Sequence, residues 1–292
     1  MTEGRIINPA PTILTLDDGQ EVELSKTAEA VEGWLNRFKV TLKITAPKAK
    51  KTSDTVVIID TSGSMKSNNR LKKAKVAAND LAEMLLDNDA GTNRVAIVPF
   101  SGNATETLDF SSSYSTVSNK INSLTASGGT FTQAGVRKAI ELINSSTASI
   151  KNVILLSDGE PTYSYKMINP VPYLETVSNS QKETNANSPR DNYTNERIGN
   201  GNSLTTILYA EGCANDFNYF NTKCFYNHGN SAIAEAGFLK ASLNSVSGNL
   251  YAIALDTNEI GTDILSRMAS SGKFKPASPE KILLGFLEKL AG

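Results

Sequence analysis

Asp60, Ser62 and Ser64 present a carboxylate and two hydroxyls at alternate positions, directly after an apolar run at residues 56–59. The run is short and β-branched, which is typical of a strand buried on both faces of a parallel sheet. Gly63 permits a tight turn between the two serines. Hard cations take oxygen ligands, so this arrangement predicts a divalent-metal site. The alternative interpretation is that both serines only cap the helix that follows.

Two later segments carry oxygen ligands in similar positions. Thr130 follows two glycines and precedes an amphipathic helical pattern, and Asp158 follows a second buried run at residues 153–157. Each has an ordinary alternative, since a threonine can cap a helix and an aspartate can form a turn. Ligands of open parallel sheets bind beyond the carboxyl ends of the strands, where the strand order reverses. We therefore expect Asp60 and Asp158 to lie together at such an edge.

The segments DTSGSM (residues 60–65), GGT (residues 128–130) and VILLSDG (residues 153–159) occur in one order along the chain. Together they resemble the metal-ion-dependent adhesion site of von Willebrand factor A (VWA) domains. The resemblance implies a set of five metal ligands, namely Asp60, Ser62, Ser64, Thr130 and Asp158.

The resemblance also implies how such a site works. The hydroxyls are neutral ligands, while Asp60 and Asp158 supply the charge, often through bound water. Mg²⁺ is the implied ion, with Mn²⁺ or Ca²⁺ as alternatives, and it prefers six oxygens in near-octahedral geometry. An acidic side chain of another protein would fill a position that the domain leaves open. The implied activity is adhesion and not catalysis.

Alternating strand and helix patterns predict a doubly wound α/β fold, with a mostly parallel central sheet flanked by helices. Helices are expected over residues 70–87, 114–124, 132–144, 231–246, 260–270 and 279–290. Besides the strands that end at Asp60 and Asp158, strands are expected over residues 94–100, 105–110 (an edge strand), 250–255 and 273–277. We assign residues 53–292 to the VWA domain.

Residues 160–230 form an insertion in this domain, because a plain α/β connection needs only a few residues. The insertion holds seven of the nine tyrosines, whereas disordered segments are poor in aromatic residues. We therefore expect a folded, arm-like excursion with its own small core. Tyrosine with serine and asparagine is also typical of adaptable binding surfaces. The candidates for contact with a ligand are Glu160, Tyr163, Tyr165 and Phe131, although a solvated turn residue is the preferred interpretation of Glu160.

Cys213 and Cys224 are the two cysteines, and both lie in the insertion. They lack the spacing of zinc ligands, and the lone His228 cannot complete a four-ligand site. A disulfide between them is the preferred interpretation, with two free thiols in a reducing compartment as the alternative.

Residues 1–52 are expected to contribute strands and a linker to neighbouring domains. Residues 40–45 alternate like a half-buried strand, and residues 13–24 fit a hairpin around the turn Asp17-Asp18-Gly19. We expect the chain to be an excised segment of a longer protein.

Several classes of function find no support in the sequence. The net charge is −1, and charged residues of both signs are dispersed along the chain without a basic stripe. Nucleic-acid binding is therefore not expected. No apolar run approaches the roughly 18 residues of a membrane span. An enzyme is not expected either, since no general base adjoins the metal motif and the common catalytic motifs are absent.

A VWA domain with a long insertion at this position resembles the tip adhesins of Gram-positive, particularly streptococcal, pili. The resemblance implies an extracellular location on the bacterial cell wall and a role in virulence. The implied partners are a host extracellular-matrix or cell-surface protein offering a carboxylate, and pilus backbone subunits reached through flanking domains. Two alternatives remain open: an intracellular VWA module of an ATPase or chelatase complex, and a structural pilus component whose metal only stabilises the fold.

Overall fold

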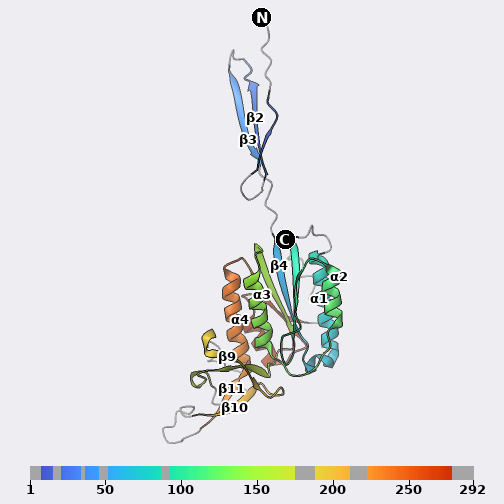
Figure 1. Cartoon of the computed structure of the whole chain (residues 1–292), viewed down its shortest axis with the longest axis vertical. Coiled ribbons are helices and arrows are strands. Elements are labelled where there is room, and N and C mark those ends of the chain that lie inside the picture. The colour runs from blue at the N-terminus through green and yellow to red at the C-terminus, as the bar shows by residue number, and fades with distance from the viewer. Residues whose placement is uncertain are drawn as a thin grey trace. The chain divides into compact units, whose positions relative to one another are not determined.

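The computed structural model describes residues 8–15, 21–33, 37–45, 52–86, 92–174, 188–210 and 222–277. The chain divides into two compact units, Met1–Lys50 and Lys51–Gly292, which are described separately below (Figure 1). None of the described helices is long and apolar enough to cross a membrane.

The larger unit is built on a six-stranded sheet with the order β13-β12-β7-β4-β5-β6. Its strands are β4 (Ser53–Asp60), β5 (Asn93–Phe100), β6 (Leu108–Ser111), β7 (Ile150–Ser157), β12 (Asn249–Leu255) and β13 (Phe274–Ala277). All neighbouring pairs are parallel except β5 and β6, so β6 is an antiparallel edge strand. The predicted fold class, a doubly wound and mostly parallel sheet, is confirmed.

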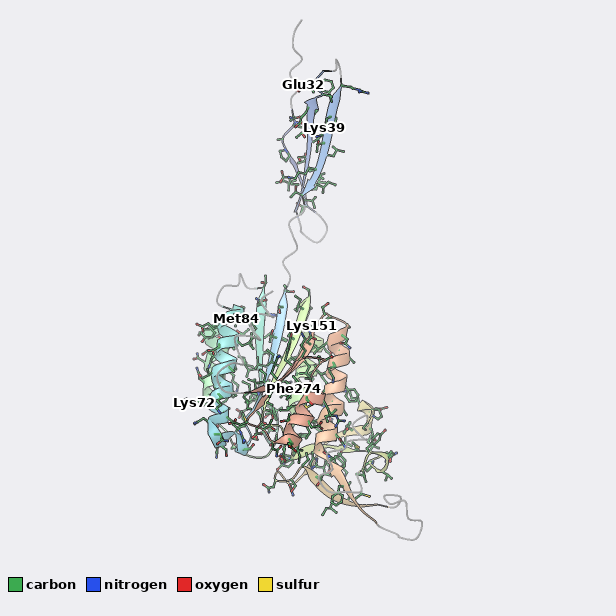
Figure 2. All side chains as sticks on the ribbon, turned by 180° about the vertical axis from the view of Figure 1, so that it is seen from behind. Glu32, Lys39, Lys72, Met84, Lys151 and Phe274 are labelled. Carbon is green, nitrogen blue, oxygen red and sulfur yellow. The ribbon has the colours of Figure 1, made fainter. Side chains whose placement is uncertain are left out.

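Helices cover both faces of this sheet (Figure 1). Helices α1 (Arg70–Leu86) and α2 (Tyr114–Ser123) lie on one face, and α3 (Thr132–Ser145), α4 (His228–Asn244) and α5 (Glu259–Met268) lie on the other. Alternation along β4 explains the two layers, because Val57 and Ile59 pack toward α1 while Val56 and Ile58 pack toward α3. The outer surface of α1 carries Lys72 and Met84 (Figure 2).

Helix α4 begins three residues earlier than the sequence pattern predicts. The side chain of Asn227 accepts hydrogen bonds from the backbone N–H groups of Gly229 and Asn230, and this cap starts the helix at His228. The predicted helix at residues 279–290 lies outside the described residues.

The insertion forms two antiparallel hairpins. One pairs β8 (Tyr163–Met167) with β9 (Tyr193–Gly199), and the other pairs β10 (Thr205–Ala210) with β11 (Thr222–Asn227). Short 3₁₀ turns, η2 (Val171–Tyr173) and η3 (Arg190–Asn192), lie between β8 and β9. A separate hydrophobic cluster is buried here, made of Met167, Leu174, Tyr193, Cys224 and Tyr226. The described part of the insertion is therefore folded around a small core of its own.

The smaller unit is a three-stranded antiparallel sheet of β1 (Thr12–Thr15), β2 (Glu21–Ala30) and β3 (Phe38–Thr45). Its first two strands form the expected hairpin, although the turn at residues 17–19 lies outside the described residues. The expectation that residues 40–45 are half-buried is wrong, since Leu42 and Ile44 are 74% and 72% exposed. The physical reason is that a single sheet layer, without a second layer on its apolar face, cannot exclude water from that face.

Candidate metal centre

Asp60 ends the central strand β4, and its side chain is fully buried. The backbone N–H of Ser62 donates a hydrogen bond to its Oδ1 (2.8 Å), and the hydroxyl of Ser157 donates to its Oδ2 (2.6 Å). Burial raises the pKa of Asp60 to about 7, and the nearby charge of Asp158 adds to the rise, while both hydrogen bonds oppose it. Among the described residues, no cationic side chain forms an ion pair with Asp60.

Ser62 and Ser64 lie on the loop that leaves β4, with their Oγ atoms 3.0 Å apart. Ser62 occupies the N-cap position of the 3₁₀ turn η1 (Gly63–Asn69), but its side chain makes no capping hydrogen bond. Helix α1 starts only at Arg70. For Ser62 the capping interpretation is therefore wrong, and its hydroxyl instead contacts that of Ser64. This contact keeps two potential oxygen ligands together.

Thr130 belongs to a second loop that is tied to the first by backbone hydrogen bonds. The N–H of Gly63 donates to the carbonyl of Gly128 (2.8 Å). Thr130 is buried, and the N-cap position of helix α3 is held by Phe131, so Thr130 is not the cap residue. Its backbone N–H donates to Thr162 Oγ1 (2.8 Å), and its carbonyl accepts from the N–H groups that begin the insertion. The base of the insertion thus holds this loop in place.

Asp158 lies directly after β7, the strand next to β4 in the sheet. Its side chain is 7% exposed, and Arg70 Nη1 lies 3.1 Å from its Oδ2. Arg70 also donates to the carbonyl oxygens of Ser64 and Asp256. The third loop is therefore linked to the first loop and to the loop after β12 through one guanidinium.

These loops border one cavity of about 730 Å³. It is lined by Gly63, Ser64, Arg70, Gly128, Gly129, Thr130, Asp158, Glu160, Thr162, Gly201, Asn202, Asp256, Thr257 and Asn258. Ser64, Thr130 and Asp158 line it directly, while Asp60 and Ser62 are buried beside Ser64 and Ser157.

The donor set fits a hard divalent cation. It offers two carboxylates and three hydroxyls, all oxygen ligands of the kind that Mg²⁺ takes. The buried carboxylate of Asp60 faces the charge of Asp158 without a protein cation of its own, which is the charge arrangement that a metal ion would relieve. Among the described residues, no three histidine, cysteine, aspartate or glutamate side chains form a group that could hold a metal ion, so the proposed ligand set depends on its hydroxyls as well as on its two carboxylates.

Arg70, Ser157 and Asp256 were missed by the sequence reasoning. Ser157 precedes Asp158 at the end of a predicted strand. The predicted pairing of that strand with the strand ending at Asp60 could therefore have indicated a contact between Ser157 and Asp60. The contact of Arg70 with Asp158 spans 88 positions, and its contact with Asp256 spans 186. No local sequence pattern predicts contacts between residues that lie so far apart along the chain.

The four candidates for ligand contact lie in different environments. Glu160 lines the cavity, and its carboxylate accepts a hydrogen bond from Asn258, the N-cap of α5. Phe131 is only 4% exposed, with ring centroids 4.7 Å from Tyr165 and 6.2 Å from Tyr163. Phe131 therefore packs the insertion onto the core and offers little surface to a ligand.

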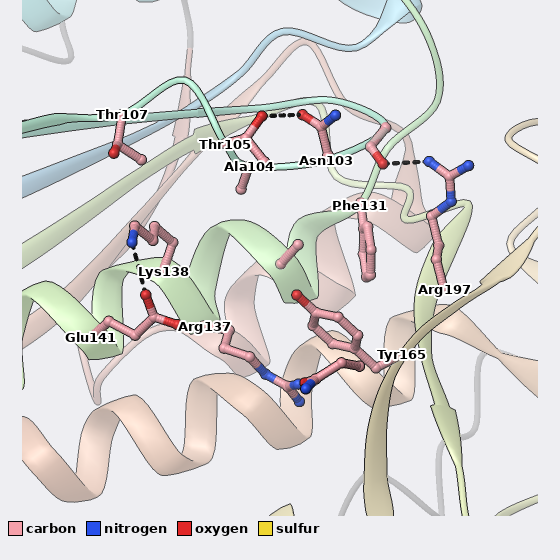
Figure 3. Close-up of a pocket in the computed structure, with 13 residues that line it drawn as sticks. Asn103, Ala104, Thr105, Thr107, Phe131, Arg137, Lys138, Glu141, Tyr165 and Arg197 are labelled. Carbon is pink, nitrogen blue, oxygen red and sulfur yellow. Dashed lines mark hydrogen bonds and ion pairs between the residues drawn. The ribbon is translucent and has the colours of Figure 1, made fainter.

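The two tyrosines are each covered by an arginine. The guanidinium of Arg137 lies 3.7 Å from the ring centroid of Tyr165, and that of Arg197 lies 4.2 Å from the ring centroid of Tyr163. Figure 3 shows Tyr165 beside Phe131 and Arg137 in a second cavity, of about 680 Å³. This cavity lies between the β5–β6 loop, α3 and the hairpin β8–β9. The aromatic residues thus join the insertion to α3.

His228 has a structural role, because its imidazole contacts side chains from both hairpins of the insertion. Its Nδ1 lies 2.7 Å from Ser164 Oγ and its Nε2 lies 2.9 Å from Thr206 Oγ1. The imidazole is fully buried, and burial lowers its pKa to about 3. It is therefore a neutral group that ties α4 to both hairpins of the insertion.

The predicted disulfide is not tested here. Cys224 is buried in the small core of the insertion, whereas Cys213 lies outside the described residues. The pairing stays a prediction, and counting alkylated thiols in unreduced protein would test it.

The chain is similar to known proteins in both sequence and fold. Residues 55–160 match the model of the von Willebrand factor type A domain. Over 160 residues the chain is 34% identical to the minor fimbrium subunit Mfa5 of Porphyromonas gingivalis. This aligned stretch covers 53% of this chain and 13% of that relative's length.

Two solved structures share the fold. The vWF domain of the type V pili tip protein Mfa5 from P. gingivalis matches with a TM-score of 0.68 and 22% identity, over 84% of this chain and 95% of that one. The pilus adhesin SpaC of Lactobacillus rhamnosus GG matches with a TM-score of 0.63 and 20% identity, over 96% of this chain and 35% of that one. The predicted VWA resemblance is confirmed.

Proposed function

We propose that this chain is the adhesive VWA segment of a pilus or fimbrial tip protein on the bacterial cell surface. A divalent cation, Mg²⁺ in the first instance, would be held by Asp60, Ser62, Ser64, Thr130 and Asp158. The segment would bind an acidic side chain of a host extracellular-matrix or cell-surface protein, while flanking domains join it to pilus subunits.

One observation carries the proposal: two carboxylates and three hydroxyls from three loops converge at the ends of β4 and β7 and at the start of α3. Asp60 and Asp158 supply negative charge, and the serine and threonine hydroxyls supply neutral oxygens. When bound, the cation would supply an electrophilic centre with room for an outside carboxylate. The aspartates are held in place by Ser157, Ser62 and Arg70 before any partner arrives.

The comparisons support the pilus setting. The relatives are named as a fimbrium subunit, a pili tip protein and a pilus adhesin. The insertion is proposed as the element that selects the partner, because one metal–carboxylate bond carries little specificity. Its base adjoins the cavity through Thr162, and Gly201 and Asn202 line the cavity as well.

No observation favours a hydrolase. Ser164 and His228 are in contact, but both side chains are fully buried and out of reach of a substrate, and an imidazole with so low a pKa is a weak general base. An ATPase-docking module or a structural pilus component would each be supported by a failed adhesion test.

Metal binding is tested by calorimetry with Mg²⁺ and Mn²⁺ on the wild type and on Asp60→Ala. The variant should lose binding and keep its fold, because the ligands lie at strand ends. Asp109→Ala removes an exposed carboxylate from β6 and serves as the control, with unchanged binding expected. Equal affinity in Asp60→Ala and the wild type would refute the assignment of the site.

Adhesion is tested on immobilised extracellular-matrix proteins with and without EDTA. Replacing residues 168–192 with a short Gly/Ser linker leaves both strands β8 and β9 and the hydrogen bonds of Thr162 and Tyr163 with Thr130 in place, since Met167 and Tyr193 pair across the gap. Metal affinity should remain, and adhesion should fall by about tenfold, or about 1.4 kcal/mol. Full adhesion of the trimmed protein would show that this part of the insertion does not select the partner.

A further inference from the structure

Arg70 is the cation nearest to the proposed ligands among the described residues, and the sequence motif does not include it. It is the first residue of α1, and its side chain is 18% exposed. Its guanidinium contacts the Asp158 carboxylate and the carbonyls of Ser64 and Asp256, which belong to three different loops. The guanidinium is therefore held by three acceptors at the edge of the cavity, and it places a positive charge next to the proposed ligands.

The charges next to the site decide what it will accept. When both aspartates are ionised, as metal ligands are, Asp60 and Asp158 contribute two negative charges and Arg70 one positive charge, so this group has a formal net charge of −1. A divalent cation would bring the net charge to +1, and one external carboxylate would bring it to zero. Burial makes these charges interact more strongly than charges in water.

Other charged groups at the cavity affect the charge of the proposed metal site less than Arg70 does. Lys73 pairs with Asp256 (3.0 Å), and both side chains are about one-third exposed, so their charges cancel and are screened. Glu160 is bonded to Asn258 at the head of α5, in an exposed contact. Its negative charge therefore acts through water, whereas Arg70 acts through a direct contact with a proposed ligand.

We propose that Arg70 sets the charge of the metal site, so that the loaded site has a net positive charge which an acidic group of the partner neutralises. This inference rests on the proposed function and adds a selectivity-determining residue to it. Arg70 weakens the binding of the metal and strengthens the binding of the acidic ligand. A site with the two aspartates alone would hold the metal more tightly and would be neutral once loaded, with no net charge to attract a carboxylate.

The test uses Mn²⁺ and acetate as probes on the whole chain. Calorimetry gives the Mn²⁺ affinity, and water-proton relaxation of the Mn²⁺-loaded protein follows acetate binding, with chloride as the control for ionic strength. Arg70→Gln removes the charge but keeps a donor for Asp158. It should bind Mn²⁺ about tenfold more tightly and acetate at least about threefold more weakly, because a nearby unit charge is lost.

Two further variants separate charge from geometry. Arg70→Lys keeps the charge but not the guanidinium fork, so both affinities should stay within about threefold of the wild type. Lys73→Met removes a charge three positions along the same helix and should also stay within about threefold, because that pair is exposed.

The results discriminate sharply. Unchanged or weaker Mn²⁺ binding in folded Arg70→Gln overturns the inference while the proposed metal site stands. A tenfold change in Arg70→Lys also overturns it, since geometry would then matter more than charge. Absence of Mn²⁺ binding in the wild type would overturn the proposed function and this inference together.

Discussion

The buried ion pair between Arg137 and Glu235 provides a stringent test of how the insertion is attached to helices α3 and α4. Glu235 on α4 is fully buried and Arg137 on α3 is 13% exposed. Arg137 donates to both carboxylate oxygens (3.1 and 2.9 Å), and Gln133 donates to one of them (3.0 Å). Arg137 also covers Tyr165 of the insertion, whose backbone N–H donates to Gln133.

Arg137→Met should lower the free energy of unfolding by about 4 kcal/mol. The change removes the two charge-assisted hydrogen bonds to Glu235, at about 1.5–3 kcal/mol each, and a longer one to the carbonyl of Thr194, and it leaves a buried carboxylate with a single partner. That sum agrees with the loss of about 3–5 kcal/mol expected on breaking a buried ion pair. Urea unfolding followed by circular dichroism gives the loss.

Matched variants make this prediction decisive. Lys138→Met removes the neighbouring ion pair with Glu141, in which the side chains are 35% and 56% exposed, and should cost less than about 1 kcal/mol. Arg137→Met combined with Glu235→Gln removes both charges and should recover at least about 2 kcal/mol of the loss. A loss below about 1 kcal/mol in Arg137→Met, or no recovery in the double variant, would refute the reasoning.

Two other predictions concern pH and close packing. Because the pKa of His228 is about 3 in the folded chain and near 6.5 when unfolded, stability is lost as pH falls below about 6.5. Between pH 7 and 5, urea unfolding should show about 2 kcal/mol more loss in the wild type than in His228→Gln, and equal losses would contradict this. Gly129→Ala should cost about 1–3 kcal/mol, since its Cβ would lie 2.5 Å from Tyr163 and 2.8 Å from Gly201. Gly237→Ala, which meets nothing within 4 Å on the exposed side of α4, should instead gain about 0.5–1 kcal/mol in the same assay, and a loss at both glycines would contradict the packing argument.

The sequence predicted the sheet and the three loops because their signals are local. Two strand-forming runs, at residues 56–59 and 153–157, are each followed by an aspartate, and both runs form central strands that neighbour one another. The pairing of β4 with β7 then follows from the fold class, and it brings Asp60 and Asp158 to one edge. Local patterns could not predict the partner of each carboxylate, since Arg70 and Asp158 are 88 positions apart in the sequence and meet through the tertiary fold.

The aromatic residues show a different limit. Composition correctly indicated a folded insertion, but it did not distinguish tyrosines that bind a partner from tyrosines that hold the insertion to the core. Tyr165 and Tyr163 pack on Phe131 and lie under arginines from α3 and β9. Such pairings depend on which side chains face each other across elements, and a sequence pattern does not encode this information.

These contacts change what the insertion is. The sequence pattern alone suggests that residues 162–227 could be replaced by a short linker without affecting the metal loops. In the structure, Thr162 and Tyr163 donate backbone hydrogen bonds to the carbonyl of Thr130, and the hydroxyl of Thr162 accepts from the N–H of that residue. Removing the whole insertion would therefore free the loop that carries a proposed ligand. Under the proposed function, selectivity and metal affinity both depend on these hydrogen bonds, so a deletion confined to residues between Met167 and Tyr193, which leaves the bonds in place, can separate the two.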